Sequence, residues 1–208
     1  MVDVIIDQVS DGRAQWRSIN RVVGLMVHRC GVNSRTGAVI GYDAPAICDA
    51  FTGRAPRWRD VAKATNGQNP YTFYIGGNLG PAELDGKVWQ ALPLDEIGHH
   101  ALGCSADHIG IALIGDFRVG PASDRQWSAA VDLCADLCLM LSLPPRHVVG
   151  HGEMTQAHKG IKAPGQPGAC PGDLLVMDAF RERIHDEMRA RARADAIWRL
   201  EQVNVRLL

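Results

Sequence analysis

The sequence predicts a single α/β domain, built on a mixed central β-sheet flanked by helices and followed by a C-terminal helical extension. Short apolar runs typical of strands alternate along the chain with amphipathic helical segments. The 208 residues suffice for one sizeable core and are few for two full domains. We find no internal repeat and no low-complexity linker that would divide the chain.

The strands are predicted from apolar runs bounded by turn residues. The run at 109–117 is apolar enough to be buried on both faces of the sheet. The run at 21–28 ends in a histidine, and the run at 147–151 ends in another. The predicted strands are 21–28, 71–77, 87–94, 109–117 and 147–151.

Two helices are predicted from their capping residues and apolar stripes. Asp43 could cap a short helix that has Pro45 near its first turn. Ser123 or Asp124 caps a longer helix, which the prolines at 144–145 end. The apolar stripe of this helix has spacings of three and four residues and consists of Trp127, Val131, Cys134, Cys138 and Leu141.

From about Asp173 the pattern is helical almost to the end of the chain, and its later part is highly charged. Arginines alternate there with acidic residues, which predicts a helix face in solvent, although this face could also contact anionic envelope polymers or a partner protomer. We therefore expect a catalytic domain at 1–180 and a charged C-terminal helical extension at 181–208.

The composition is that of an ordinary soluble globular protein, with 46% hydrophobic and 22% charged residues. The formal net charge of −1 does not indicate a nucleic-acid partner. No apolar run approaches the roughly 20 residues that span a bilayer. The first residues, MVDVIIDQVSDGR, do not resemble a secretory signal, so we expect a cytoplasmic protein. Most of the six cysteines are expected to be free thiols.

Three residues that can bind zinc lie at the ends of predicted elements. His28 and His151 each end a strand, and Cys170 precedes the final helix. A catalytic zinc site uses three protein ligands and leaves a fourth position open. The spacing alone is a weak signal, because a single histidine at the end of a strand is more often structural.

The order of the motifs adds a stronger signal. The stretches LMVHRCG, NPYTFYIGG, the run DGKVWQALPLDEIGHHALGCSADHIGIALIGDF, VVGHGEM and ACPGD follow one another along the chain. Together they resemble the zinc amidase family that includes phage endolysins, cytosolic muropeptide-recycling amidases and animal peptidoglycan recognition proteins. The resemblance covers roughly residues 21–180 and makes the first part of the chain an expected amidase catalytic domain.

The resemblance implies a role for each matching residue. His28, His151 and Cys170 fall on the three zinc ligands. Tyr71 falls on a tyrosine that hydrogen-bonds the attacking water or the developing oxyanion. Since Tyr71 and Tyr74 are three residues apart, a regular strand would point them to opposite faces, and only Tyr71 would face the metal. His100 resembles a substrate-contacting histidine on the rim of the groove.

The sequence departs from the family pattern before the third ligand. Relatives usually have a lysine or threonine two residues before it, where this chain has Gly168. Lys159 or Lys162 of the long preceding loop could replace that group, and we expect Lys162 to do so. Glu153 could orient a metal-binding histidine or act as a base.

The reaction that the resemblance implies is zinc-dependent hydrolysis of the amide bond between N-acetylmuramic acid and L-alanine. We expect a monomeric phage or prophage endolysin that acts on peptidoglycan and reaches the periplasm or cell wall on lysis. A cytosolic amidase that recycles anhydro-muropeptides, a delivered antibacterial toxin and a non-catalytic peptidoglycan-binding module remain open. A structural zinc site would need a fourth ligand, for which Cys30 is the candidate.

Overall fold

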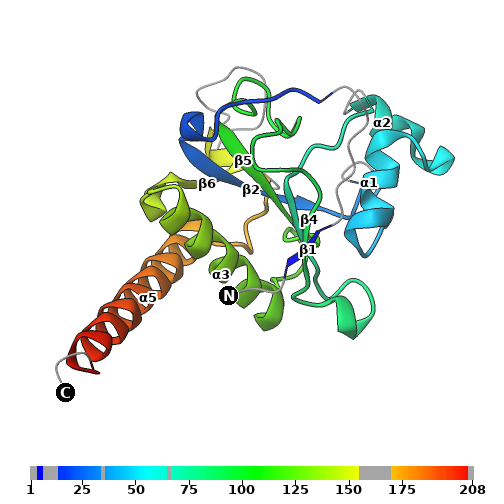
Figure 1. The fold of residues 1–208 in the computed structure, drawn as a ribbon. Helices are drawn as coiled ribbons and strands as arrows, with labels where there is room; N and C mark the ends of the chain where they lie inside the picture. The colour runs from blue at the N-terminus through cyan, green and yellow to red at the C-terminus, as the bar shows by residue number, and fades with distance from the viewer. Residues whose placement is uncertain (1–3, 7–13, 34–35, 65–66, 155–169, 206–208) are drawn as a thin grey trace.

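A computed structural model of the chain describes residues 4–6, 14–33, 36–64, 67–154 and 170–205. Within them, helices α1 (Ala44–Thr52) and α2 (Arg59–Ala64) lie on one side of a six-stranded sheet. Helices α3 (Asp124–Met140) and α5 (Met177–Val205) lie on the other side (Figure 1). This arrangement confirms the predicted α/β domain with a mixed sheet flanked by helices.

The sheet has the strand order β1-β4-β3-β5-β2-β6. Neighbouring strands are parallel, except for the antiparallel pair β3 and β4. The carboxyl ends of β2, β5 and β6 therefore meet at one edge of the sheet. The strands are β1 (Val4–Ile6), β2 (Gly24–Cys30), β3 (Phe73–Ile75), β4 (Val88–Gln90), β5 (His108–Ile114) and β6 (Val148–Gly150).

The larger part of the core lies between the sheet and helices α3 and α5. The Ser123 side chain caps α3 by accepting a hydrogen bond from the backbone N–H of Gln126, as the sequence predicts. The rings of Trp127 on α3 and Phe180 on α5 meet edge to face, with centroids 5.1 Å apart. Buried residues of both helices pack there against Val27, Ile75 and Ile111 of the sheet, among others.

A second core cluster lies on the other face, beneath α1. Asp43 caps this helix through the N–H of Ala46, and Gly53 ends it in the left-handed conformation. Ile47 and Phe51 of α1 pack against strand residues that include Tyr74. This cluster borders the carboxyl end of β2, where the metal-binding candidates lie.

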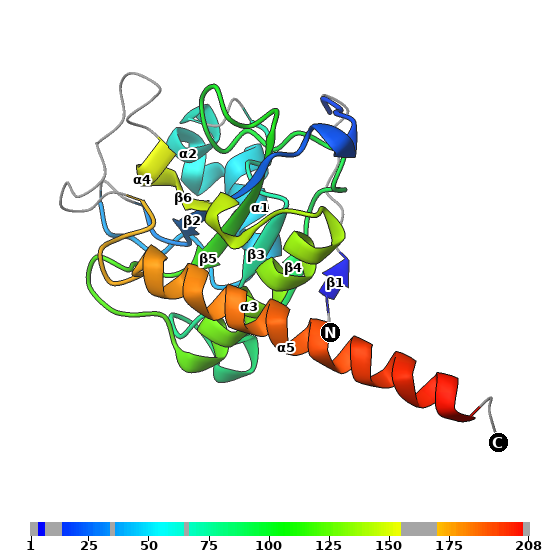
Figure 2. The same cartoon turned by 90° about the vertical axis from the view of Figure 1, so that its left-hand side faces the viewer.

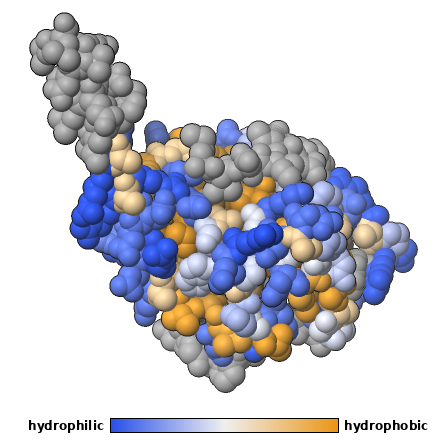
Figure 3. Space-filling model, turned by 90° about the horizontal axis from the view of Figure 1, so that it is seen from below, coloured by the Kyte–Doolittle hydropathy of each residue, from blue (hydrophilic) through white to orange (hydrophobic). Residues whose placement is uncertain are grey.

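Helix α5 runs past the body of the domain, as Figures 1 and 2 show. Near the body its outward side chains are largely exposed, and Figure 3 shows mostly hydrophilic residues where it leaves the domain. Arg191 is an exception, because it pairs with Asp132 and Asp136 of α3 as well as with Glu187. The predicted boundary after residue 180 falls inside this helix and stays a prediction.

Three described elements, β1, α2 and the short helix α4 (His151–Met154), were not predicted. Strand β1 is only three residues long and gains its order from pairing with β4, which a short apolar run does not reveal. Helix α2 follows a 3₁₀ turn at Pro56–Trp58, and the other 3₁₀ turns are Ile19–Arg21, Ala82–Leu84 and Pro145–His147. None of the helices in the described part of the chain is both long and apolar enough to cross a membrane.

Candidate metal centre

His28, His151 and Cys170 come together at one edge of the sheet. Each offers one ligand atom, and these atoms lie within 4.8 Å of one another. The Nδ1 atom of His28 is 3.8 Å from the Sγ atom of Cys170. The ring centroids of His28 and His151 are 4.5 Å apart.

The strand register explains why the two histidines meet. Strands β2 and β6 are parallel neighbours, with Val27 opposite Gly150. His28 follows Val27 on β2, and His151 follows Gly150 and begins the short helix α4 (His151–Met154). His28 lies within β2 rather than at its end, because β2 continues to Cys30.

Cys170 is held in place by the backbone around it. The N–H of Arg29 donates to the Cys170 sulfur at 3.4 Å, and the N–H of Gly152 donates to the Cys170 carbonyl at 2.6 Å. The Arg29 guanidinium also donates to the carbonyl of Pro171 at 3.2 Å. Residues next to both histidines thus fix the position of the thiol.

The electrostatics favour neutral imidazoles at this centre. Burial lowers the pKa of His28 well below its usual value, and the nearby His151 and His100 lower it further. Burial also lowers the pKa of His151. The pKa of the Cys170 thiol is raised by burial, although the N–H and guanidinium of Arg29 partly oppose this.

The residues fit a zinc ion. Two neutral imidazoles and one sulfur form a donor set that zinc prefers, and they leave a fourth position open. The Nε2 atom of His151 is buried and has no hydrogen-bond partner among the residues that the structure describes, which is costly for a polar atom unless another group binds there. Cys30 is buried in the core cluster beneath α1 and is not among the three grouped residues.

Tyr71 lies beside this centre. Its ring centroid is 4.9 Å from that of His28, and it lines a cavity of about 330 Å³ together with Arg29 and Cys170. Burial raises the pKa of Tyr71 well above its usual value, and the Cys170 sulfur adds to this effect. The hydroxyl therefore keeps its proton at neutral pH and can act as a hydrogen-bond donor.

The expectation that Tyr71 and Tyr74 point to opposite faces is wrong. Their rings meet edge to face, with centroids 5.5 Å apart, in the core cluster beneath α1. Strand β3 begins only at Phe73, so strand alternation does not extend back to Tyr71. Tyr74 is fully buried and donates its hydroxyl hydrogen bond to Asn69.

Glu153 lies on α4 with its carboxylate turned to α5. Arg181 donates to both of its oxygens, at 2.9 and 3.0 Å, and the N–H of Gly150 donates to one of them at 2.7 Å. The carboxylate therefore ties α4 to α5 and to the end of β6. Lys159, Lys162 and Gly168 lie outside the described residues.

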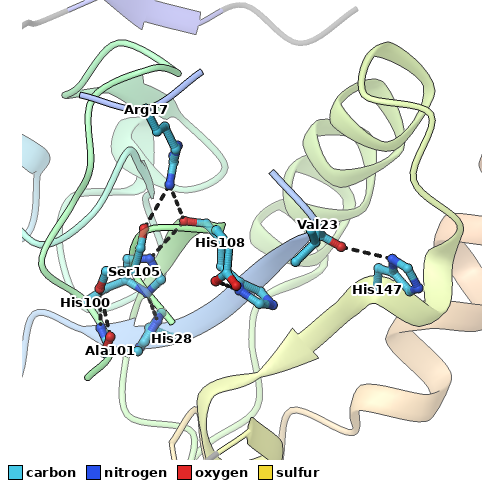
Figure 4. A network of polar contacts seen from close by, with 9 residues as sticks. Arg17, Val23, His28, His100, Ala101, Ser105, His108 and His147 are labelled. Atoms are coloured by element: carbon cyan, nitrogen blue, oxygen red, sulfur yellow. Dashed lines mark hydrogen bonds and ion pairs between the residues drawn. The ribbon is translucent and has the colours of Figure 1, made fainter. Parts of the chain in front are cut away.

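His100 is only 8% exposed and lies against His28. Its Nδ1 atom is 3.1 Å from Nε2 of His28, and its Nε2 atom is 3.2 Å from the backbone carbonyl of His108 (Figure 4). Burial lowers the pKa of His100 to about 3, and the hydrogen bond to His108 opposes part of this shift. The family resemblance implied a position on the rim of a groove, whereas this side chain is buried.

Arg17 is a buried residue for which the sequence predicted no role. Its guanidinium donates to the carbonyls of Ser105 and His108 at 2.9 and 2.8 Å, and to that of Leu94 at 3.1 and 3.3 Å. Desolvation lowers its pKa from the usual value. No sequence signal could have identified it, because its partners lie far along the chain and are backbone atoms.

Comparison with known proteins identifies the family of the chain independently of the geometry of the site. A family model described as N-acetylmuramoyl-L-alanine amidase matches residues 18–173. Peptidoglycan-recognition protein 1 of Holotrichia diomphalia is 32% identical over 111 residues, which are 52% of this chain and 46% of that protein. A peptidoglycan-recognition protein of Drosophila melanogaster is also 32% identical, over 107 residues that make up 51% of this chain and 49% of that protein. The match thus spans about half the length of these curated relatives.

Solved structures share the fold at low sequence identity. The N-acetylmuramoyl-L-alanine amidase LysC from Clostridium intestinale has a TM-score of 0.59 at 16% identity, covering 89% of this chain and 99% of that one. The Ph2119 endolysin from a Thermus scotoductus bacteriophage has a TM-score of 0.58 at 20% identity, covering 87% and 98%. Since the family model matches most of the chain, this protein belongs to the N-acetylmuramoyl-L-alanine amidase family.

Proposed function

We propose that this protein is a zinc-dependent amidase that hydrolyses the bond between N-acetylmuramic acid and L-alanine in peptidoglycan. The observation that carries the proposal is the convergence of His28, His151 and Cys170 beside a cavity. A zinc ion held by these residues would supply Lewis acidity toward the substrate carbonyl. The family match supports the choice of bond.

Tyr71 is the second group in this proposal. It lies next to His28 and lines the same cavity as Cys170. Because its hydroxyl stays protonated, it can donate a hydrogen bond to the amide oxygen as negative charge develops there. Lys162 remains the candidate for a further catalytic group, whereas the carboxylate of Glu153 is bound by Arg181, which favours a structural role for it over the catalytic one.

For the biological role, we propose a phage or prophage endolysin that acts as a monomer on the cell wall. The tyrosine at position 71 supports this choice, since it resembles the phage and animal branches of the family. A recycling amidase for soluble anhydro-muropeptides has the same chemistry and differs in substrate size. The curated relatives are named as recognition proteins, so a non-catalytic binding module is the alternative of a different class.

The test measures bound zinc in the purified protein and cleavage of two substrates, sacculi and soluble anhydro-muropeptides, with and without a chelator. New amino ends of L-alanine that depend on the metal would support the amidase. A preference for sacculi would support the endolysin, and a preference for soluble fragments the recycling enzyme. Bound zinc without cleavage of either substrate would overturn the enzymatic proposal in favour of a binding module.

A further inference from the structure

The contact between His28 and His100 has a direction that its partners determine. The His108 carbonyl can only accept a hydrogen bond, so Nε2 of His100 must carry a proton to donate to it. A neutral imidazole has one protonated nitrogen, which leaves Nδ1 of His100 as an acceptor. The Nε2 atom of His28, 3.1 Å away, must then be the donor.

This direction fixes the free lone pair of His28. With its proton on Nε2, a neutral His28 has an unprotonated Nδ1. That atom is the one that faces the Cys170 sulfur, at 3.8 Å. The hydrogen bond therefore prepares Nδ1 of His28 as a ligand on the side of the ring where Cys170 lies.

We propose that His100 is a positioning residue that holds His28 in the tautomer and orientation needed to bind the metal, with the His108 carbonyl and Arg17 holding His100 in turn. This inference rests on the proposed zinc site and assigns His100 a role inside the protein rather than contact with substrate. Figure 4 shows the line of contacts from Arg17 through the His108 carbonyl and His100 to His28.

Arg17 supplies the fixed end of this line. Its guanidinium donates to the same His108 carbonyl that accepts from His100, at 2.8 Å, and to the Ser105 carbonyl at 2.9 Å. The Ser105 hydroxyl in turn donates to the Ala101 carbonyl, next to His100, at 2.9 Å. The turn that follows His100 is thus closed by the hydrogen bond between Ser105 and Ala101, and Arg17 ties it to the start of β5.

Strand β5 leaves room for the His100 ring only because residue 110 is glycine. A Cβ atom at Gly110 would lie 2.8 Å from Cδ2 and 2.9 Å from Cγ of His100, which is too close for carbon atoms. Gly110→Ala would therefore displace the ring without removing the imidazole. This substitution therefore tests whether the position of the His100 ring matters, while the imidazole itself is retained.

The first experiment uses the wild-type protein and needs no substitution along the line of contacts from Arg17 to His28. Nitrogen-15 NMR of the histidine side chains in the wild-type protein, with and without zinc, reports which ring nitrogen carries each proton. We expect His28 to carry its proton on Nε2 in both forms. A proton on Nδ1 of His28 in the metal-free protein would overturn the proposal.

The second experiment measures zinc affinity by competition with a chromophoric chelator. His100→Phe keeps the ring volume but removes the acceptor, so the zinc dissociation constant should rise about 10- to 100-fold. His100→Asn places its amide oxygen near the position of Nδ1 and should recover most of that loss. Gly110→Ala should weaken binding in the same direction as His100→Phe. His185→Gln, which removes an exposed histidine of α5, is the matched control and should have no effect.

The outcomes separate this inference from the proposed function. Unchanged zinc affinity in a folded His100→Phe variant, checked by circular dichroism, would overturn the positioning role while the zinc site stands. A wild-type protein that binds no zinc would overturn the zinc site itself. The tautomer of His28 in that metal-free protein would then still decide the direction of the hydrogen bond.

Discussion

The Nε2 atom of His28 lies 3.1 Å from the Nδ1 atom of His100, so a candidate metal ligand forms its hydrogen bond to a second buried imidazole rather than to a carboxylate. A carboxylate partner would favour a charged imidazolium, whereas an imidazole partner beside Arg17 does not. The centre is therefore built from neutral side chains, and both its stability and its metal binding should depend on pH.

The metal-free protein should lose stability as the pH falls below about 6.5, the pKa of histidine in an unfolded chain. Burial lowers the pKa of His28, His100 and His151 in the folded protein, and that of His100 to about 3. The unfolded chain therefore binds more protons in this range, which costs up to about 1.4 kcal/mol per pH unit for each histidine. Urea unfolding between about pH 7 and about pH 5 measures the slope of the free energy of unfolding against pH.

His100→Phe should make this slope shallower, because one buried histidine no longer contributes to it. His185→Gln removes an exposed histidine and should leave it unchanged. If the wild type and His100→Phe showed the same slope, His100 would have to be protonated to a similar extent in the folded and unfolded chains.

Cys170→Ala should abolish stoichiometric zinc binding and lower amidase activity by more than the roughly 100-fold loss typical of residues that only support a ligand. The reason is that the variant leaves two ligands where a catalytic zinc site needs three. Metal analysis and the amide-cleavage assay check both effects. Cys30→Ala is the matched control, because Cys30 belongs to the core cluster beneath α1. Zinc loss in Cys30→Ala would instead support a structural site with four ligands.

The family motifs allowed the three candidate ligands to be predicted, because each lies in a distinctive local sequence. The surroundings of His100 could not be predicted in the same way. The stretch that contains it reads as a polar surface turn, yet Arg17, 91 residues before His108, reaches its carbonyl and closes the turn onto β5. Contacts between distant side chains and backbone atoms leave no local pattern in a sequence.

The error about the two tyrosines has a different cause, which is the unknown start of the strand. Period-two alternation holds only inside a regular strand, and the apolar run at 71–77 gave no sign that β3 begins at Phe73. The strands predicted at 21–28, 109–117 and 147–151 were confirmed, with their ends shifted by a few residues, because the parallel strands β2, β5 and β6 are mostly apolar. The short edge strand β1 lacks that signal.

Tyr71→Phe should lower kcat by about 100-fold and leave bound zinc unchanged, since it removes one hydrogen-bond donor to the developing negative charge. Steady-state kinetics on a soluble muropeptide, together with metal analysis, measure this. A wild-type kcat in Tyr71→Phe would exclude the proposed role of its hydroxyl.

Tyr74→Phe provides the matched comparison for that experiment. It removes a buried hydrogen bond to Asn69, which should cost about 1 kcal/mol of stability. Because the Tyr74 hydroxyl points to Asn69 and not into the cavity beside Cys170, kcat should stay close to that of the wild type. Equal losses of kcat in both variants would indicate a shared packing effect instead of a catalytic hydroxyl.

Glu153→Gln distinguishes a structural from a catalytic carboxylate. Arg181 donates to both oxygens of Glu153, and the Glu153 side chain is 35% exposed, so the pair should stabilise the fold by about 1 kcal/mol or less. A double-mutant cycle with Arg181→Gln in urea measures this coupling. We expect kcat to change less than threefold or so in either variant, because the carboxylate is engaged by α5. A loss of about 100-fold in Glu153→Gln, with normal activity in Arg181→Gln, would instead identify Glu153 as a general base.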